Sequence, residues 1–394
     1  MTNLTNLSVS GSLNRLGTET AFEVLARAKQ LEAEGRPIIH LGIGAPDFDT
    51  PEHIKEACAK ALRDGHTAYC PAQGIPELRE ACAAYLSRSR GIHVDPARVV
   101  VTPGAKPFLG YAVMATCDPG DEVIYPNPGF PIYESVIRYF GATPVPLPLS
   151  EDREFSFTAD DLAARLSPRT RLVILNSPAN PTGGVIESDE MAGIAEVLGA
   201  SDAWILSDEV YSEMVYEGSH DSIARHDELA DRTILVDGFS KTFAMTGWRL
   251  GYAAVPEPLV EPITRLIINT VSCTPPATQL AGVAALEGPW DAVRSMVEEF
   301  RRRREVVVKG LNDLPGVSCV MPHGAFYAFP NVSETGLGTR ELASLSLERA
   351  GVAVVAGTSF GEYGEGYLRV SYANSVENIE AGLAALRELL EAEL

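Results

Sequence analysis

The sequence predicts an α/β protein with a mostly parallel sheet covered by helices, followed by a smaller α+β region. Through the middle of the chain, apolar runs of strand length alternate with helical stretches, a pattern typical of buried parallel sheets. Beyond residue 314, short strands and helices follow one another without strict alternation. A length of 394 residues is sufficient for about two or three domain cores.

The composition indicates a soluble globular protein and excludes some partners. Hydrophobic residues make up 45% and charged residues 22% of the chain. Acidic residues outnumber basic ones by 53 to 32, which disfavours binding to nucleic acid or to anionic membranes. The six cysteines are scattered and do not cluster with histidine, so we expect no metal site. With no long apolar run and no signal-peptide pattern, we expect a cytoplasmic protein.

The chain begins with a segment, residues 1–17, that is rich in Ser, Asn, Thr and Gly and is expected to be a flexible arm. Thr20 and Glu23 have the spacing of a capping box, which predicts a helix over 21–34 ended by Gly35.

The next helix is predicted over 52–64, with Thr50 as its N-cap and Pro51 in its first turn. Six buried strands are then expected, each followed by a turn. They are Arg98–Thr102, Glu122–Tyr125, Leu172–Asn176, Trp204–Ser207, Thr233–Val236 and Leu250–Ala254.

A helical pattern covers 290–314, and its arginine run, Arg301–Arg304, is expected to form a solvated helix face. The remaining predicted elements are strands at 325–329, 352–355 and 367–371 and a last helix over 376–391.

One stretch, 233–252, combines a strand, a turn and two basic residues. Lys241 follows the apolar strand closely, and Arg249 comes eight residues later. A lysine desolvated at the end of a buried strand suits Schiff-base chemistry, and the planar fork of arginine suits phosphate. The alternative is a surface turn with an ordinary lysine and a salt-bridging arginine.

The string SKTFAMTGWRLGY in this stretch resembles the lysine segment of pyridoxal-phosphate enzymes of the aspartate aminotransferase superfamily, the class I/II aminotransferases of fold type I. The resemblance implies that Lys241 is catalytic and carries pyridoxal 5'-phosphate covalently, while Arg249 and Ser240 hold the phosphate. Relatives often have serine where this chain has Gly238, so one hydroxyl contact to the phosphate is expected to be missing. The similarity runs from about Ala21 to the last helix.

The turn Gly104-Ala105-Lys106 follows a strand and opens a helix, an arrangement that favours anions. In the family a phosphate-binding turn stands here, so the resemblance assigns these three residues to the cofactor. Phe130 matches the aromatic residue that stacks on the pyridine ring, although a plain core aromatic is the alternative.

The segment NSPANPTG resembles the family's NxPxNPTG signature, which makes Asn180 a donor to the cofactor's phenolic oxygen. Asp208 matches the partner of the pyridine nitrogen, and Tyr211 matches a second donor to the phenolic oxygen. A carboxylate at Asp208 has a clear physical purpose, because a protonated ring nitrogen makes the cofactor an electron sink.

Arg369, in YLRVSYA, resembles the arginine that clamps the substrate's α-carboxylate, and Gly44 matches the glycine facing the same group; Asn180 is also expected to contact substrate. Tyr69 matches a tyrosine that reaches the phosphate in the neighbouring subunit's site. The resemblance therefore implies a homodimer.

The resemblance implies a large cofactor-binding domain at 51–298 and a small domain formed by 18–50 and 299–394. The expected activity is ping-pong transfer of an amino group from an L-amino acid to a 2-oxo acid, with 2-oxoglutarate or another dicarboxylate on one side. Lys106 matches a lysine that binds a distal carboxylate in one bacterial branch, whereas Glu19 near the pocket would repel one. The donor is therefore left open between dicarboxylic, aromatic, aliphatic and specialised amino acids.

Two alternatives share the same motifs: a pyridoxal-phosphate lyase that eliminates across a carbon–sulfur bond, and a cyclopropane-forming synthase. A non-catalytic effector-binding module is a remote alternative, because only about 20 residues precede the first core helix, fewer than a DNA-binding helix-turn-helix needs.

Overall fold

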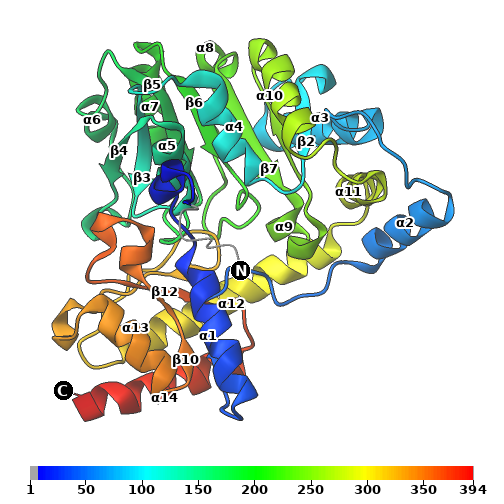
Figure 1. Cartoon of the computed structure of the whole chain (residues 1–394). Coiled ribbons are helices and arrows are strands. Elements are labelled where there is room, and N and C mark those ends of the chain that lie inside the picture. The colour runs from blue at the N-terminus through cyan, green and yellow to red at the C-terminus, as the bar shows by residue number, and fades with distance from the viewer. Residues whose placement is uncertain (1–7, 394) are drawn as a thin grey trace, which may run out of the picture.

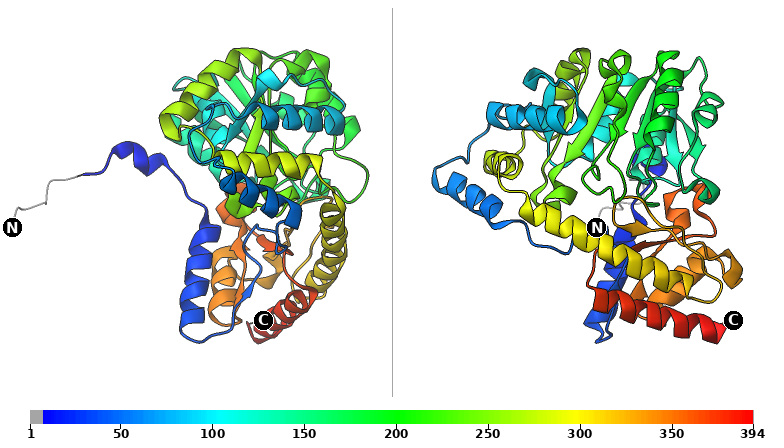
Figure 2. Two further views of the ribbon diagram at one scale, coloured as in Figure 1. Left: turned by 90° about the vertical axis from the view of Figure 1, so that its right-hand side faces the viewer. Right: turned by 180° about the vertical axis from the view of Figure 1, so that it is seen from behind.

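The structure is a computed structural model that describes residues 8–393. The largest sheet has seven strands. Figure 1 shows this sheet flanked by helices, with a second, smaller group of helices and short strands below it. The long helix α12 (Asp291–Asn312) runs from the first group into the second, as Figure 2 shows from behind. In the part of the chain from residue 8 to 393, no helix has both the length and the apolar composition needed to span a membrane.

The large sheet contains all six strands expected from the sequence. Every neighbouring pair is parallel except the two pairs that involve β8, which runs antiparallel to both of its neighbours. In spatial order the strands are β2 (Val99–Thr102), β8 (Gly251–Ala254), β7 (Thr233–Gly238), β6 (Trp204–Asp208), β5 (Thr170–Asn176), β3 (Glu122–Asn127) and β4 (Thr143–Pro148).

The sequence interpretation missed β4, which reads TPVPLP. Proline has no backbone N–H to donate, so a run with three prolines argues against a central strand. The strand is formed because it lies at the sheet edge and pairs only with β3. Its prolines are tolerated there because one side needs no ladder of hydrogen bonds.

Helices cover both faces of this sheet, as its parallel strands require. Alternate residues of β7 show the two faces: Ile234 and Val236 pack with α4, α5 and α10, whereas Leu235 packs with α3 and α11. The helices of this group are α2 (Glu52–Arg63), α3 (Pro76–Arg90), α4 (Pro107–Thr116), α5 (Ile132–Phe140), α6 (Ala159–Ala163), α7 (Ser188–Gly199), α8 (Asp227–Ala230), α9 (Phe239–Thr242), α10 (Glu257–Thr270) and α11 (Pro276–Glu287).

The second group joins segments from both ends of the chain. Strand β1 (Ile39–His40) pairs in parallel with β10 (Val352–Ala353). Strand β12 (Leu368–Ser371) pairs antiparallel with β11 (Val355–Ala356) and β9 (Tyr327–Ala328). The helices are α1 (Thr20–Ala33), α13 (Thr339–Glu348) and α14 (Val376–Glu393), together with α12. The α/β class with a smaller α+β region is thus confirmed, while the exact domain boundaries stay a prediction.

Two helix starts differ from the expected capping. Helix α1 begins at Thr20 with Glu19 as its N-cap residue, and no side chain caps it, so the predicted capping box is wrong. Helix α2 has Pro51 as its N-cap residue. The hydroxyl of Thr50 donates instead to the carbonyl of Ala244 at 2.8 Å. For α2, a tertiary contact thus takes the hydroxyl that local capping would have used, whereas Thr20 fails as a cap because it is already the first residue of α1.

Of the expected arm, residues 1–7 lie outside the described part of the chain. A 3-10 turn, Gly11–Arg15, follows. The Arg15 guanidinium donates to the carbonyls of Arg138 and Tyr139 at 3.1 and 3.2 Å, which ties this turn to the end of α5.

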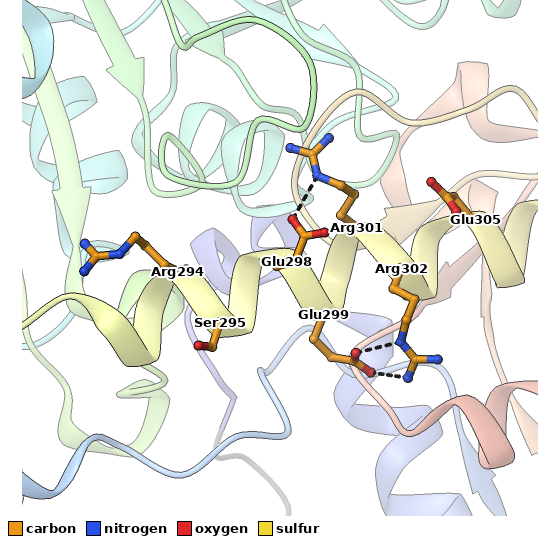
Figure 3. Close-up of a pocket in the computed structure, with 7 residues that line it drawn as sticks. All are labelled: Arg294, Ser295, Glu298, Glu299, Arg301, Arg302 and Glu305. Atoms are coloured by element: carbon orange, nitrogen blue, oxygen red, sulfur yellow. Dashed lines mark hydrogen bonds and ion pairs between the residues drawn. The ribbon is translucent and has the colours of Figure 1, made fainter.

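The arginine run Arg301–Arg304 is exposed on one side of α12 only. Figure 3 shows the exposed side, where Arg301 pairs with Glu298 at 3.3 Å and Arg302 pairs with Glu299 at 2.8 Å. Pairs at such spacing along an exposed helix stabilise it modestly. For these two arginines the solvated face is confirmed.

The other two arginines of the run are buried, so the expectation is wrong for them. Arg303 donates to Asp47 at 2.7 Å, and Arg304 forms a fork with Glu217 at 2.6 and 2.7 Å. Adjacent residues on a helix point in different directions, so a run of four identical residues necessarily spans the inner and the outer face.

A buried ionic cluster lies behind the carboxyl ends of two central strands. Arg90, at the end of α3, donates to Glu209 at 2.8 Å, to Asp237 at 2.7 Å and to the hydroxyl of Ser212 at 2.6 Å. His220 contacts the other side of the cluster, 2.9 Å from Glu209. The cluster ties α3 to the ends of β6 and β7, the strands that lead into the predicted cofactor residues.

We predict that Arg90→Leu lowers the stability of the folded protein by about 3–5 kcal/mol, because it leaves two buried carboxylates without their cation. Thermal denaturation followed by circular dichroism measures the effect. Arg265→Leu is the control, since it breaks only an exposed pair with Glu261 and should change the melting temperature little. Equal effects of the two substitutions would contradict the structural importance of the cluster.

Candidate functional site

A cavity of about 590 Å³ lies at the carboxyl ends of the central strands of the large sheet, where ligands bind in open α/β folds. Its walls come from both groups of elements. Eleven of the predicted site residues line it: Gly44, Ala105, Lys106, Phe130, Asn180, Asp208, Tyr211, Ser240, Lys241, Arg249 and Arg369. The two predicted residues outside the lining are Gly104 and Tyr69.

Lys241 lies on α9, directly after β7, and its side chain reaches across the cavity. Its ammonium donates to the carbonyl of Gly44 and lies 5.8 Å from the ring centre of Tyr211 and 5.7 Å from that of Phe326. Burial lowers the pKa of Lys241 to about 8, and the positive charge of Arg369 adds to the effect. The lysine is therefore easily converted to a free amine, the form that acts as nucleophile or base.

Asp208 ends β6 with its carboxylate in the cavity. Tyr133 donates its hydroxyl to Oδ2 at 2.7 Å, while Oδ1 is buried without a hydrogen-bond partner among the described residues. Burial raises the pKa of Asp208 to about 6, although the hydrogen bond from Tyr133 opposes the rise. An unpaired buried acceptor facing a cavity fits a ligand that brings an N–H, as a protonated pyridine nitrogen does.

Tyr133 was not predicted as a site residue. It stands three residues after Phe130, at the start of α5, and the two rings meet edge to face at 5.8 Å. This spacing is a signal that could have placed both side chains at the same end of the helix.

The two asparagines of the NSPANPTG segment, Asn176 and Asn180, have different roles. The side chain of Asn176 donates to the carbonyl of Asp208 at 3.0 Å and accepts from the backbone N–H of Asn180 at 3.0 Å. Asn176 therefore shapes the loop, and the loop presents the Asn180 amide to the cavity.

Arg369 is a buried cation without an anionic partner in residues 8–393. Its guanidinium donates to Oδ1 of Asn180 at 2.9 Å and to the carbonyl of Gly42 at 2.6 Å, and Nε is buried without a partner. The rings of Tyr327 and Phe360 lie on it, each 4.7 Å from the guanidinium carbon. Burial lowers the pKa of Arg369 from its ordinary value. A guanidinium held in this way is prepared for a carboxylate from a ligand.

Arg249 lies at another side of the cavity, against the turn that opens α4. It donates to the carbonyl of Thr246 at 2.8 Å. A side chain at Gly104, which has φ +84°, would place its Cβ 2.2 Å from the Arg249 guanidinium. Gly104 does not line the cavity, but its lack of a side chain allows the guanidinium to approach the turn. Together with the backbone of the turn Gly104-Ala105-Lys106 ahead of α4, Arg249 forms a cationic surface suited to a phosphate.

Gly238 also lines the cavity, in an extended conformation that any residue can adopt. A Cβ added there would lie 3.4 Å from the Cβ of Ala105, which is ordinary contact. The absence of the expected serine is therefore not imposed by lack of space.

A pair of tyrosine hydroxyls closes the back of the cavity. The hydroxyls of Tyr211 and Tyr327 lie 2.7 Å apart. Burial raises the pKa of Tyr211 well above its ordinary value, so it keeps the proton that a donor needs. A Cβ on Gly44 would lie 2.1 Å from the Tyr327 hydroxyl, which explains the glycine. Tyr327 was missed because its strand has only two residues and no motif.

Phe130 is half-buried and packs against the α4–α5 core while lining the cavity, so it serves the core and the site together. Lys106 is not free: its ammonium pairs with Glu19. Tyr69 is 89% exposed and lies away from the cavity of its own chain, so its role in a neighbouring subunit stays a prediction.

Comparison with known proteins agrees with this geometry. The profile of the family described as aminotransferase class I and II matches residues 36–386. The chain is 40% identical over 377 residues to the aspartate aminotransferase of Pyrococcus horikoshii, covering 94% of each protein. It is 43% identical over 358 residues to aromatic-amino-acid aminotransferase 2 of Thermococcus litoralis, covering 90% of this chain and 92% of that one.

Among solved structures, the aspartate aminotransferase from Rhizobium meliloti matches with a TM-score of 0.93 at 36% identity, over 98% of this chain and 99% of that one. The expected aspartate aminotransferase-like architecture of fold type I is thereby confirmed.

From the raised pKa of Asp208 we predict how the stability of the cofactor-free protein depends on pH. Since the pKa of Asp208 in the folded state, about 6, lies above its ordinary value of 3.8, the folded state binds the proton more tightly than the unfolded state. The stability of the fold therefore falls as the pH rises through this interval. Asp208→Asn should therefore stabilise the cofactor-free protein by roughly 3 kcal/mol at pH 7, and the gain should disappear near pH 4. Thermal melts across this pH range measure it.

Asp202→Asn, at an exposed position, is the matched control and should show no such pH-dependent gain. A stabilisation by Asp208→Asn that is the same at both ends of the range would contradict the assignment to ionisation of this carboxyl group.

Proposed function

The chain belongs to the class I and II aminotransferase family and is a pyridoxal-phosphate-dependent aminotransferase, and from this premise we propose which residues carry out its chemistry. The observation that carries the proposal is that Lys241, Asp208 and Arg369 line one cavity while their hydrogen bonds go to neutral groups within residues 8–393. Buried charges are normally paired, so three uncompensated charges at one place point to charged ligands.

The cofactor has a ring nitrogen, a phenolic oxygen and a phosphate, and the cavity has a group for each. The open oxygen of Asp208 suits the protonated ring nitrogen. The Asn180 amide and the Tyr211 hydroxyl are the donors proposed for the phenolic oxygen. Phe130 is proposed to stack on the ring face.

The phosphate is proposed to lie against Arg249, the Ser240 hydroxyl and the start of α4, where Gly104, Ala105 and Lys106 present their backbone. When bound, pyridoxal phosphate supplies an electron sink for the electron pair left at the substrate's Cα.

Substrate binding is proposed to use Arg369, with Gly44 and Asn180 beside it. The guanidinium orients the α-carboxylate, which fixes the direction of the Cα–H bond. Lys241 would hold the cofactor covalently in the resting enzyme, and its amine, when free, would take the proton from Cα. The lowered pKa of Lys241, about 8, keeps a usable fraction of this amine unprotonated near neutral pH.

The full reaction is proposed to be ping-pong: an L-amino acid leaves as its 2-oxo acid, and a second 2-oxo acid takes up the amino group. We propose 2-oxoglutarate or another dicarboxylate on one side. The active unit is proposed to be a cytoplasmic homodimer in which Tyr69 of each subunit reaches the phosphate in the other site. Tyr69 is 89% exposed, so its side chain is free to enter a neighbouring subunit's site.

The first test is a half-reaction screen. Purified protein is mixed with single amino acids and no oxo acid, and the cofactor is followed by absorbance and mass. We expect stoichiometric conversion to pyridoxamine phosphate with release of a 2-oxo acid. Lys241→Ala should lose this conversion together with the absorbance of the covalently bound cofactor. Catalytic accumulation of pyruvate and ammonia, with the cofactor unchanged, would instead identify a lyase and overturn the proposal.

The shared site can be tested by complementation. Lys241→Ala and Tyr69→Ala subunits, each strongly impaired alone, are co-expressed with two different tags so that mixed dimers form. If Tyr69 acts in the partner's site, one site of each mixed dimer is intact, and random pairing restores about a quarter of the wild-type sites. No gain of activity in purified mixed dimers would place Tyr69 in its own subunit's site, and an active Tyr69→Ala homodimer would place it outside both sites.

A further inference from the structure

An ion pair joins two distant segments at the wall of the cavity. Glu19 precedes α1, Lys106 precedes α4, and the carboxylate and the ammonium are in direct contact. Both side chains line the cavity. Glu19 is the less exposed of the two, at 16% against 44% for Lys106. The pair is therefore part of the cavity wall.

Glu19 does not serve its own helix. It stands at the N-cap position of α1, where a carboxylate could accept from the free N–H groups, but no such bond is formed. The carboxylate turns to Lys106 instead. The Lys106 ammonium also lies 6.0 Å from the ring centre of Phe22 and 5.4 Å from that of Phe130, so the cation is held beside two aromatic faces.

Each charged residue that lines the cavity has a partner or a proposed ligand group without a second carboxylate on the substrate. The acidic lining residues are Glu19 and Asp208, and the basic ones are Lys106, Lys241, Arg249 and Arg369. Under the proposed function, all of these except Glu19 and Lys106 face the cofactor or the α-carboxylate. Those two neutralise each other. A substrate with an uncharged side chain leaves this balance intact, whereas a distal carboxylate adds a negative charge beside Glu19.

The uncharged lining of the cavity is largely apolar. The rings of Phe22 and Phe130 lie beside the pair, and aliphatic residues from four segments also line the cavity, namely Ala21, Ile43, Leu109 and Val210. Such a wall gains from contact with an aromatic or large aliphatic side chain.

We propose that Glu19 is a specificity-determining residue: it acts as a built-in counter-ion of Lys106, so that the site prefers amino donors with aromatic or large apolar side chains. A dicarboxylate binds Lys106 only by displacing the Glu19 carboxylate. This inference rests on the proposed function, because it assumes that Arg369 holds the α-carboxylate. The pair is partly exposed, so its exchange costs less than the separation of a fully buried pair.

The test compares two unreactive acids, succinate and 3-phenylpropionate, as ligands of the cofactor-loaded enzyme, with binding measured by calorimetry. Glu19→Gln frees Lys106 and should tighten succinate binding by roughly three- to tenfold, while 3-phenylpropionate changes by less than about twofold. Glu23→Gln is the matched control, since it removes the same charge from an exposed position in the first turn of α1 and should change neither binding constant. Unchanged or weaker succinate binding in Glu19→Gln would overturn the proposal.

A second variant separates the ion pair from a general loss of negative charge. In the double variant Glu19→Gln/Lys106→Met the gain for succinate should be absent, because the freed cation is gone. A gain that persists without Lys106 would contradict the counter-ion role. Failure of the proposed function is distinguishable, because it would appear as no conversion of the cofactor by any amino acid, whatever the ratio of the two binding constants.

Discussion

Three buried charges without internal counter-ions dominate this structure. The charged groups of Lys241, Asp208 and Arg369 meet in one cavity and bond only to neutral groups among the described residues. Such an arrangement is destabilising by itself, and it shows in the pKa of Asp208, raised by burial, and in the pKa of Lys241, lowered by burial. The surrounding fold must hold these groups in place until ligands of opposite charge arrive, which is the preorganisation that electrostatic catalysis requires.

The topology explains how the groups meet. Asp208 ends β6, and Lys241 follows β7 on α9. Because these two strands are neighbours and parallel, both residues lie at the carboxyl ends of the strands. Arg369 comes from β12 in the second group of elements, which is assembled from both ends of the chain by the pairing of β1 with β10. Behind the cavity, Arg90 joins the ends of β6 and β7 through Glu209 and Asp237. Under the proposed function, the sheet supplies the cofactor contacts and the second group supplies Arg369 for the substrate.

The central strands and most residues of the cavity could be predicted from the sequence. Continuous apolar runs marked the six central strands, and motifs with fixed spacing marked residues such as Lys241 and Asn180. Edge strand β4 was missed because its prolines argue against a strand unless its position in the sheet is known. Tyr133 and Tyr327 were missed because their partners, Asp208 and Tyr211, are distant in sequence. The buried arginines of α12 were missed because tertiary partners decided where those side chains point, and the capping box failed because Thr20 is the first residue of α1 and not its N-cap.

The central claim is that Lys241 is the residue that carries the cofactor, and chemical trapping tests it most directly. The holoenzyme is reduced with borohydride, digested with trypsin and analysed by mass spectrometry. Reduction fixes the cofactor to its lysine and blocks cleavage there, so the account predicts a pyridoxyl group on Lys241 within the peptide 233–249. A label on Lys106 or on any other lysine, with Lys241 unmodified, would contradict the assignment and the site built around it.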